Sequence, residues 1–163
     1  MLPFLNRQNN NSQGYNTLLL YQFFIDEIYI KISSANKYYP DFKNWYYNNV
    51  IPSIIDGDKE FIFELRNNKL VGIAIIKHSE KKLCHLSIFE EYKNRGYGLK
   101  LFEQSFRKLE TKQPYLTVSE EKYIEFKKIF NYYGFELSYT RRNTYRNNKI
   151  EYYFNAKKPN KTS

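Results

Sequence analysis

The sequence predicts one α/β (α+β) domain, with a central mixed, mostly antiparallel twisted sheet flanked by about four helices. The chain has 163 residues, of which 42% are apolar and 19% aromatic, enough to fill a single packed core. Short apolar runs typical of strands alternate with segments whose apolar residues recur at helical spacings of three and four. Two of the strands are close enough in sequence to form an antiparallel hairpin. Together these patterns predict a mixed sheet covered by helices.

The first part of the chain is predicted to form a polar arm, a strand and two helices. Residues 1–16 are polar and without periodicity, so we expect a mobile arm, with the domain proper spanning 17–155. The apolar run at 17–23 reads as a strand, and residues 26–32 carry apolar side chains at helical spacing. Asp41 is a suitable N-cap for a second helix. The apolar side of that helix would comprise Phe42, Trp45, Tyr46, Val50 and Ile54.

The rest of the domain shows a clear alternation of periods. In chain order, the expected elements are strands at 60–65, 69–76 and 83–89, a helix from Leu99, a strand at 114–119, a helix at 120–133, and strands at 135–141 and 150–154. Arg66–Asn68 is a loop short enough for a hairpin, and Gly134 is a natural stop for the helix before it. The residues from 156 to 163 read as a basic, disordered tail.

Composition excludes several classes of protein. One cysteine cannot form an internal disulfide, and with two histidines the chain lacks the ligands of a Cys/His zinc site, so we expect no metal. The longest apolar run, 70–76, is far shorter than a membrane span, and the first residues do not resemble a secretory signal. We therefore expect a cytoplasmic protein, as a monomer or homodimer.

The net charge of +9 is unevenly distributed. Residues 1–70 carry no net charge, and residues 71–163 carry the whole excess. This imbalance is expected for a chain that holds an anionic partner in its second part, either a phosphorylated cofactor or a nucleic acid. Solubility alone would also account for a basic surface.

The segment that carries the most chemical information lies where strand periodicity changes to helical periodicity. Gly96 and Gly98 stand between the strand at 83–89 and the following helix, where free backbone N–H groups at the positive end of the helix dipole suit a phosphate. Lys93, Arg95 and Lys100 would add positive charge. A tight turn is the alternative interpretation. A P-loop is excluded because no Gly-Lys-Ser/Thr ends the motif, and a dinucleotide fingerprint because the third glycine is absent.

This segment resembles the acetyl-CoA signature of the GNAT N-acetyltransferases, Gln/Arg-x-x-Gly-x-Gly/Ala. Here the motif spans Lys93–Gly98, with Lys in the first place, which retains a positive charge. The preceding 86–92 is similar to the strand and lead-in of that family, with Glu90 where Pro is usual. Downstream, the helix that closes on Tyr133-Gly134-Phe135 is similar to the family's Gly-Phe hinge. The resemblance covers about residues 60 to 155.

The resemblance implies acetyl-CoA as cofactor and assigns residues to it by position. Backbone groups where the strand splays would pair with the pantetheine arm, the loop would hold the pyrophosphate, and aromatic side chains would lie along the arm. The expected cofactor-binding residues are Leu86, Ser87, Ile88, Lys93, Asn94, Arg95, Gly96, Tyr97, Gly98, Leu99, Lys100, Tyr123, Phe126 and Phe130.

Catalytic residues are less well defined by the resemblance. Many relatives place a proton-donating tyrosine four residues before the hinge glycine, where this chain has Phe130. Tyr123 and Tyr133 share that helix face and are the candidate donors, with a packing role as the alternative for each. The glutamate that some relatives use as a base falls near Lys82, which cannot serve while protonated. His85 titrates in the useful range, but a lone histidine on an apolar strand is more often structural. A chain of water molecules, or an acceptor amine that binds in its neutral form, would make a side-chain acid or base unnecessary.

The predicted function is acetyl transfer from acetyl-CoA to a primary amine, by direct attack in a ternary complex. No Asp/Glu-His relay is readable around Cys84, which argues against an acyl-enzyme. A small-molecule or peptide amine would be drawn to carboxylates such as Asp41, Asp56, Asp58 and Glu60. Two alternatives stay open. The basic part could hold RNA, with an aminoacyl-tRNA amine as acceptor, or the chain could be a non-catalytic module that binds CoA or nucleic acid.

Overall fold

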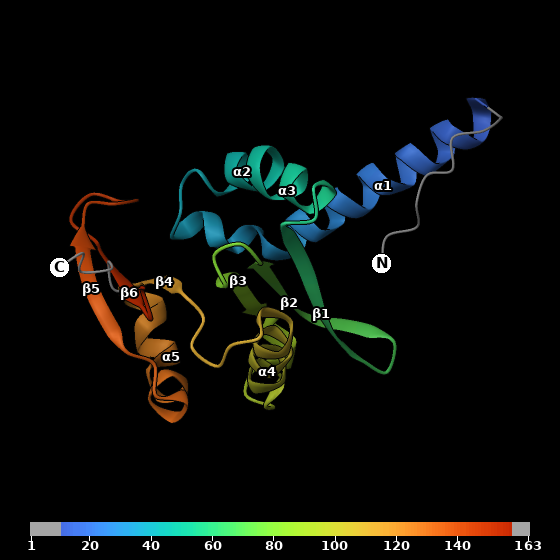
Figure 1. Ribbon diagram of the computed structural model, residues 1–163. Coiled ribbons are helices and arrows are strands. Elements are labelled where there is room, and N and C mark those ends of the chain that lie inside the picture. The colour runs from blue at the N-terminus through green and yellow to red at the C-terminus, as the bar shows by residue number, and fades with distance from the viewer. Residues whose placement is uncertain (1–10, 158–163) are drawn as a thin grey trace.

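The computed structural model describes residues 11–157 (Figure 1). Its elements in chain order are α1 (Asn11–Ile32), the 3-10 helix η1 (Ser33–Lys37), α2 (Phe42–Trp45), the π-helical turn η2 (Tyr46–Val50), α3 (Ile51–Ile55), β1 (Lys59–Arg66), β2 (Lys69–Lys77), β3 (Lys82–Ile88), the 3-10 helix η3 (Glu90–Tyr92), α4 (Tyr97–Leu109), β4 (Leu116–Ser119), α5 (Glu120–Tyr133), β5 (Leu137–Arg142) and β6 (Ile150–Phe154).

The six strands form two antiparallel sheets that touch along one short stretch. The first has the order β1-β2-β3 and the second β4-β6-β5. A parallel bridge pairs Lys82 with Tyr115, and the Leu83 N–H donates to the Tyr115 carbonyl over 2.9 Å. Beyond this point β3 and β4 have no backbone pairing among the described residues, so the two strands diverge. The region between the diverging parts of β3 and β4 is the splay, and its closed end is the bridge between Lys82 and Tyr115. The expected mixed, mostly antiparallel sheet with flanking helices is confirmed.

Helices cover both faces of this sheet. Figure 1 shows α1 to α3 on one side and α4 and α5 on the other. Side chains alternate along β2, so Ala74 and Ile76 pack toward α4 and α5 while Ile73 and Ile75 pack toward α1 to α3. Each layer therefore has its own buried apolar cluster, and β2 contributes to both.

The predicted strand at 17–23 is wrong, because these residues belong to α1. The adjacent apolar residues at 18–20 and 23–25 obscure the helical period, since they place apolar side chains on every side of the helix. Its C-terminal half packs into the core through Ile25, Ile28 and Ile32. Residues that remain at least 62% exposed on α1 are Leu18, Leu19, Leu20, Phe23 and Ile30.

The ends of the predicted domain differ in detail from the expectation. Residues 11–16 are helical and continuous with α1, whereas the rest of the expected arm, 1–10, lies outside the described residues. In the expected tail, the Ala156 N–H donates to the Ser138 hydroxyl over 2.9 Å, and 158–163 lie outside the described residues.

The other elements were predicted well. The hairpin joins β1 to β2 as expected, and α5 has the expected bounds, with the Ser119 hydroxyl accepting from the Lys122 N–H and Gly134 ending the helix at φ 67°. Asp41 precedes α2, although its side chain makes no capping hydrogen bond. No helix in the described part of the chain is both long and apolar enough to cross a membrane.

Candidate functional site

The loop between β3 and α4 presents an array of backbone N–H groups. Asn94 and Gly96 both have positive φ, 61° and 81°, and this turns the chain so that α4 begins at Tyr97. The structure gives the N–H groups of Tyr97, Gly98 and Leu99 no hydrogen-bond partner among the described residues. Such groups at a helix N-terminus carry partial positive charge, so the loop is suited to a phosphate group.

Gly98 leaves space beside this array. Its φ is not in the left-handed region, so its backbone does not require glycine. A Cβ added here would meet only Ile88, at 3.8 Å. The absent side chain thus leaves the helix start accessible from the β3 side, and this open cradle fits a pyrophosphate with an arm running along β3.

The three cations expected around the loop differ in their availability. The Lys93 ammonium pairs with the Glu90 carboxylate at 2.6 Å, and the Lys93 N–H donates to the Glu90 carbonyl over 3.3 Å. In this arrangement both groups of Lys93 are engaged with Glu90, and the contribution of Lys93 to a pyrophosphate site stays a prediction. Arg95 and Lys100 are exposed and make no ion pair within the described part of the chain.

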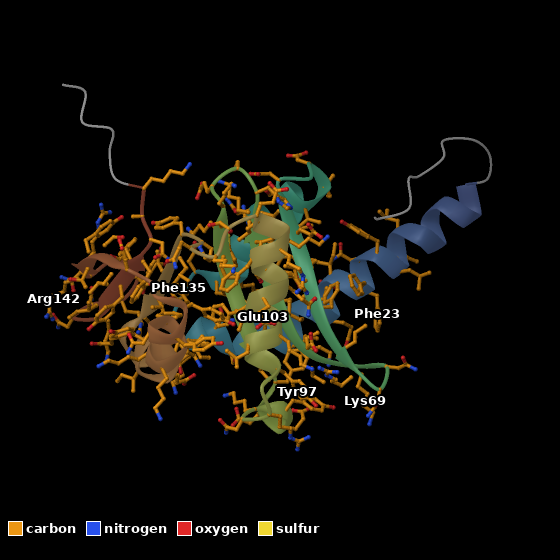
Figure 2. The ribbon with its side chains drawn as sticks, turned by 60° about the horizontal axis from the view of Figure 1, so that its bottom comes forward. Phe23, Lys69, Tyr97, Glu103, Phe135 and Arg142 are labelled. Carbon is orange, nitrogen blue, oxygen red and sulfur yellow. The ribbon has the colours of Figure 1, made fainter. Side chains whose placement is uncertain are left out.

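Arg66, which the sequence did not single out, supports the start of α4. Its guanidinium lies 5.1 Å from the centre of the Tyr97 ring and 3.3 Å from the carboxylate of Glu64, which is only 6% exposed. Gln104 of α4 also donates to Glu64. Figure 2 shows Tyr97 at the loop end of α4. The hairpin of β1 and β2 thus fixes the first residue of the helix, a long-range contact that no local pattern could predict.

The splayed part of β3 has two chemically different faces. Leu86 and Ile88 lie on the α4 and α5 side, where Tyr123 and Phe126 are also partly exposed around the same apolar cluster. Alternation turns Ser87 to the opposite face, where its hydroxyl lies 3.1 Å from His85 Nε2. Of the expected pantetheine residues, Ser87 can thus contribute only backbone groups on the cofactor side.

The candidate proton donors occupy different surroundings. Tyr123 is partly exposed and stacks on Tyr152, with ring centres 4.5 Å apart. The Tyr133 hydroxyl is buried without a hydrogen-bond partner, and its ring packs edge-on against Phe106 at 4.8 Å. Phe130 is 2% exposed and belongs to the core beside Phe154. Tyr123 lies in the first turn of α5, directly after β4, whereas Tyr133 is the last residue of that helix.

The other titratable groups of β3 are either uncharged at neutral pH or in contact with an aromatic ring. Burial lowers the pKa of His85 to about 4, and the ring packs against Phe42 at 5.5 Å. Burial raises the pKa of the Cys84 thiol to about 11, which leaves little thiolate at neutral pH. The Lys82 ammonium lies over the Tyr115 ring.

Two of the acidic residues that were expected to attract an amine already have hydrogen-bond or ion-pair partners. Asp58 accepts hydrogen bonds from Ser79, and Glu60 pairs with Lys108 at 2.7 Å and with His78 at 3.0 Å. These carboxylates lie at the base of β1, away from the splay, and they stabilise the turn between β2 and β3.

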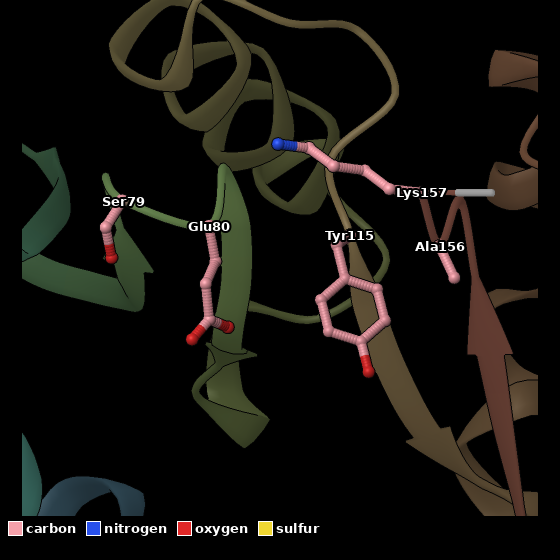
Figure 3. A pocket seen from close by; sticks show the side chains of 5 residues that line it. All are labelled: Ser79, Glu80, Tyr115, Ala156 and Lys157. Carbon is pink, nitrogen blue, oxygen red and sulfur yellow. The ribbon is translucent and has the colours of Figure 1, made fainter. Parts of the chain in front are cut away.

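A cavity of about 300 Å³ lies at the closed end of the splay (Figure 3). It is lined by Ser79, Glu80, Tyr115, Ala156 and Lys157. The N–H array lies past the other end of β3, so this cavity is separate from the candidate cofactor site.

Several cations of the basic C-terminal part are paired with carboxylates or lie over aromatic rings. Arg146 forms a bidentate pair with Glu121, with N–O distances of 3.0 and 2.7 Å, and Lys149 pairs with Glu120 and Glu121. Arg141 lies over the rings of Tyr139 and Tyr153. Two further cations of this part, Lys158 and Lys161, lie outside the described residues.

Comparison with known proteins identifies the family. Residues 34–152 match the family model described as acetyltransferase (GNAT) domain. No protein of curated function matches the sequence significantly.

Solved structures share the fold at low sequence identity. A candidate GNAT acetyltransferase from Desulfovibrio desulfuricans is 13% identical and has a TM-score of 0.55, with 64% of this chain and 73% of that chain covered. The ribosomal-protein-S18-alanine N-acetyltransferase from Escherichia coli is 18% identical, with a TM-score of 0.51 and coverages of 60% and 67%. A candidate streptothricin acetyltransferase from Bacillus anthracis, solved with acetyl-CoA, is 14% identical, with a TM-score of 0.52 and coverages of 60% and 61%.

The family model covers well over half of the chain, and the splayed strands and the N–H array agree with it. Proteins of this family use acetyl-CoA, and the open cradle at Gly98 fits that cofactor. The chain therefore belongs to the GNAT acetyltransferase family.

Proposed function

We propose that this protein transfers the acetyl group of acetyl-CoA to a primary amine by direct attack within a ternary complex. The observation that carries the proposal is the N–H array of Tyr97, Gly98 and Leu99 beside β3, whose outer edge after Leu83 pairs with no other strand among the described residues. The array would bind the pyrophosphate, and the free edge of β3 would hydrogen-bond the pantetheine arm. Bound acetyl-CoA supplies an activated thioester.

The two substrates would bind on opposite faces of the sheet at the splay. The cofactor arm would lie on the α4 and α5 side, along Leu86, Ile88, Tyr123 and Phe126, where partly exposed apolar surface is available. The amine would approach from the opposite face, where His85 and Ser87 lie. Positioning of the amine and backbone N–H groups at the developing oxyanion supply most of the rate acceleration in this proposal.

Acid–base assistance by side chains is weak in this site. Phe130 cannot donate a proton, the Tyr133 hydroxyl is buried away from the splay, and Cys84 remains a thiol. Tyr123 is the remaining donor on the cofactor side. Its partly exposed ring could release a proton to the departing thiolate directly or through water.

The proposal is tested by acetyl-CoA turnover against a panel of primary amines. We would measure release of the CoA thiol with spermidine, glucosamine, lysine amide and an alanine-terminated peptide, which span small and peptide acceptors. Turnover of at least one amine, with the acetyl group found on nitrogen by mass spectrometry, is the expected result. Tight CoA binding without acetylation of any amine would instead favour the non-catalytic CoA-binding module.

RNA as the acceptor carrier is the second candidate, supported by one observation. On β5, every residue is exposed, and Arg141 lies over the rings of Tyr139 and of Tyr153 on β6, which stack 4.5 Å apart. Cations next to aromatic rings suit single-stranded nucleic acid. RNA affinity should then fall with salt, with a log-log slope of about −0.7 per phosphate contacted. A flat salt response, or no RNA retention at low salt, would exclude this candidate.

A further inference from the structure

The N-terminal half of α1 carries an apolar surface that the described residues leave uncovered. Leu19, Leu20, Phe23 and Phe24 are 66, 70, 65 and 46% exposed, and these four residues form the α1 patch. The buried face of the helix points elsewhere, because Ile25, which is 4% exposed, lies two positions and therefore about 200° from Phe23. A helix that is apolar on all sides is stable in water only when all sides are buried, so the α1 patch needs a partner.

The α1 patch lies at the free edge of the first sheet. Figure 1 shows α1 extending past β1, on the side away from the second sheet. The ring of Phe24 packs edge-on against Phe63 of β1, with ring centres 6.0 Å apart, so one end of the patch rests on the fold. The splay borders β3, at the opposite edge of the sheet order β1-β2-β3. A partner on the α1 patch would therefore leave the splay open.

The size of the α1 patch matches the area that a specific dimer buries. At the exposed fractions given above, its four side chains expose on the order of 500 Å². Two copies facing each other would thus bury about 1,000 Å² of apolar side chain, which is the total that a specific interface requires. The composition also fits, because the centre of an interface is enriched in aromatic residues and depleted of charge.

The distribution of charge favours a second copy of this chain over a membrane surface. Residues 1–70 carry no net charge and residues 71–163 carry the whole excess of +9, so two copies can meet at α1 while their basic parts stay apart. Helices that lie in a membrane surface are rich in Lys and Arg on their polar face. Helix α1 instead has a single lysine, Lys31, and two acidic residues, Asp26 and Glu27.

The order of residues along α1 favours an antiparallel pair of helices. Residues 11–17 carry no charged side chain, whereas Glu27 and Lys31 follow the α1 patch. A parallel partner would place each of these charges opposite its own copy, and like charges across an interface repel. An antiparallel partner places them beside the uncharged first turns of the other helix. It also sets each leucine of the patch against a phenylalanine of the second copy.

We infer that this protein forms a two-fold symmetric dimer through the α1 patch, with the two α1 helices antiparallel. The occupant of the patch is thus a second copy of the chain, and the same four side chains contribute from both copies. This inference goes beyond the proposed function and does not rest on it, since each copy holds its own splay and its own N–H array.

The test measures association of the full-length protein by sedimentation equilibrium between about 1 and 100 µM, the range of dissociation constants expected for a small interface. Phe23→Lys and Leu20→Lys each place a charge in the α1 patch. Ile55→Lys, on α3 and also 65% exposed, is the matched control. Wild type and Ile55→Lys should be dimeric at the upper concentration, and the association constant should fall at least tenfold in each patch variant. Leu20→Lys decides the question should Phe23→Lys fail to fold.

A distance between the two copies tests the antiparallel arrangement. Lys31→Cys in a Cys84→Ala background carries one spin label per chain, and pulsed electron paramagnetic resonance measures the label separation. At a rise of 1.5 Å per residue, labels at position 31 lie about 28 Å apart along the axes of an antiparallel pair centred on the patch. A parallel pair would bring them within about 10 Å. A distance near 30 Å is expected, and one near 10 Å would contradict the inference.

Other occupants of the α1 patch give different results. A wild-type protein that stays monomeric at about 100 µM, or a dimer that persists unchanged in both patch variants, would overturn the inference. So would binding of the monomer to phosphatidylserine vesicles that Phe23→Lys abolishes, which would identify a membrane as the partner. A dimer that forms only after deletion of residues 1–10 would show that this segment occupies the patch, and would also count against a second copy.

Catalysis and folding of the single copy separate this inference from the proposed function. On dilute, monomeric protein, CoA affinity, turnover and the urea midpoint should agree between wild type and Phe23→Lys, because an exposed side chain contributes little to the fold of one copy. Absence of turnover in every variant would count against the proposed function and leave the dimer standing. Loss of the dimer alone is measured by mass and leaves the proposed function standing.

Discussion

The Tyr39 hydroxyl donates a 2.9 Å hydrogen bond to the carboxylate of Glu151, 112 positions further along the chain. The same hydroxyl accepts from the Ser119 N–H at the end of β4. The loop between η1 and α2 thereby connects the helical layer over the first sheet to the second sheet. It crosses the side of the splay that faces away from α4 and α5, where the acceptor is proposed to bind.

The position of Gly98 should tolerate a methyl group but not a carboxylate. An added Cβ has room in the protein, since it would meet only Ile88 at 3.8 Å, so Gly98→Ala should raise helix stability by up to about 1 kcal/mol. The family signature allows alanine at this position, so CoA affinity by calorimetry should stay close to that of the wild type in Gly98→Ala. Gly98→Asp, which adds a negative charge, should abolish binding.

The control for this charge change is Arg107→Gln, near the other end of α4. It alters the net charge by the same amount and should leave CoA affinity within twofold of wild type. Wild-type affinity in Gly98→Asp would contradict the placement of the pyrophosphate on this loop.

The two tyrosines of α5 should differ in what they contribute. Tyr133→Phe removes a buried hydroxyl that has no partner, so the free energy of unfolding should rise by about 1 kcal/mol, with little change in kcat. Tyr123→Phe should lower kcat less than about a hundredfold, because positioning carries most of the rate. Urea unfolding and steady-state kinetics check both variants. A larger loss of kcat in either one, with CoA affinity intact, would reveal a dedicated general acid.

His85 should make stability depend on pH. Its pKa of about 4 lies below the ordinary value of 6.5, so the unfolded chain binds more protons between these values. The contribution of His85 to stability is therefore complete above pH 6.5 and is lost as the pH falls toward 4, with a slope approaching 1.4 kcal/mol per pH unit. His85→Gln should lose this slope in unfolding experiments from pH 4 to 7. An unchanged slope would show that other groups cause the dependence.

Phe102 should be the main link between α4 and α5. It is 2% exposed, and its ring centre lies 6.0 to 6.4 Å from those of four aromatic residues outside α4, which are Phe126, Phe130, Tyr133 and Phe135. Phe102→Ala should lower the free energy of unfolding by about 3 to 5 kcal/mol and weaken CoA binding, because both helices flank the cofactor site. Phe23→Ala, 65% exposed on α1, should cost less than about 1 kcal/mol. Similar losses in the two variants would refute this assignment.

The sequence by itself determined the features that depend on neighbouring residues. Alternation and helical spacing located β1 to β6, α4 and α5, and the motif around Gly96 and Gly98 located the turn that begins α4, because periodicity, caps and positive φ are local properties. The helix was predicted at 26–32 but missed at 17–23 for the same reason, since the adjacent apolar residues at 18–20 and 23–25 obscure the helical period.

Only the tertiary structure decided which groups face one another. A single bridge between Lys82 and Tyr115 leaves the rest of the β3 edge free of β4, packing buries the hydroxyl of Tyr133, and the sheet order β4-β6-β5 brings Glu151 beside Ser119 and under Tyr39. In the sequence, Glu151 was a single acidic residue among cations, and no motif in the neighbouring residues indicated a role for it. Such relationships arise from strand order and packing between segments far apart in the chain, and their free energy depends on partners that no window of sequence contains.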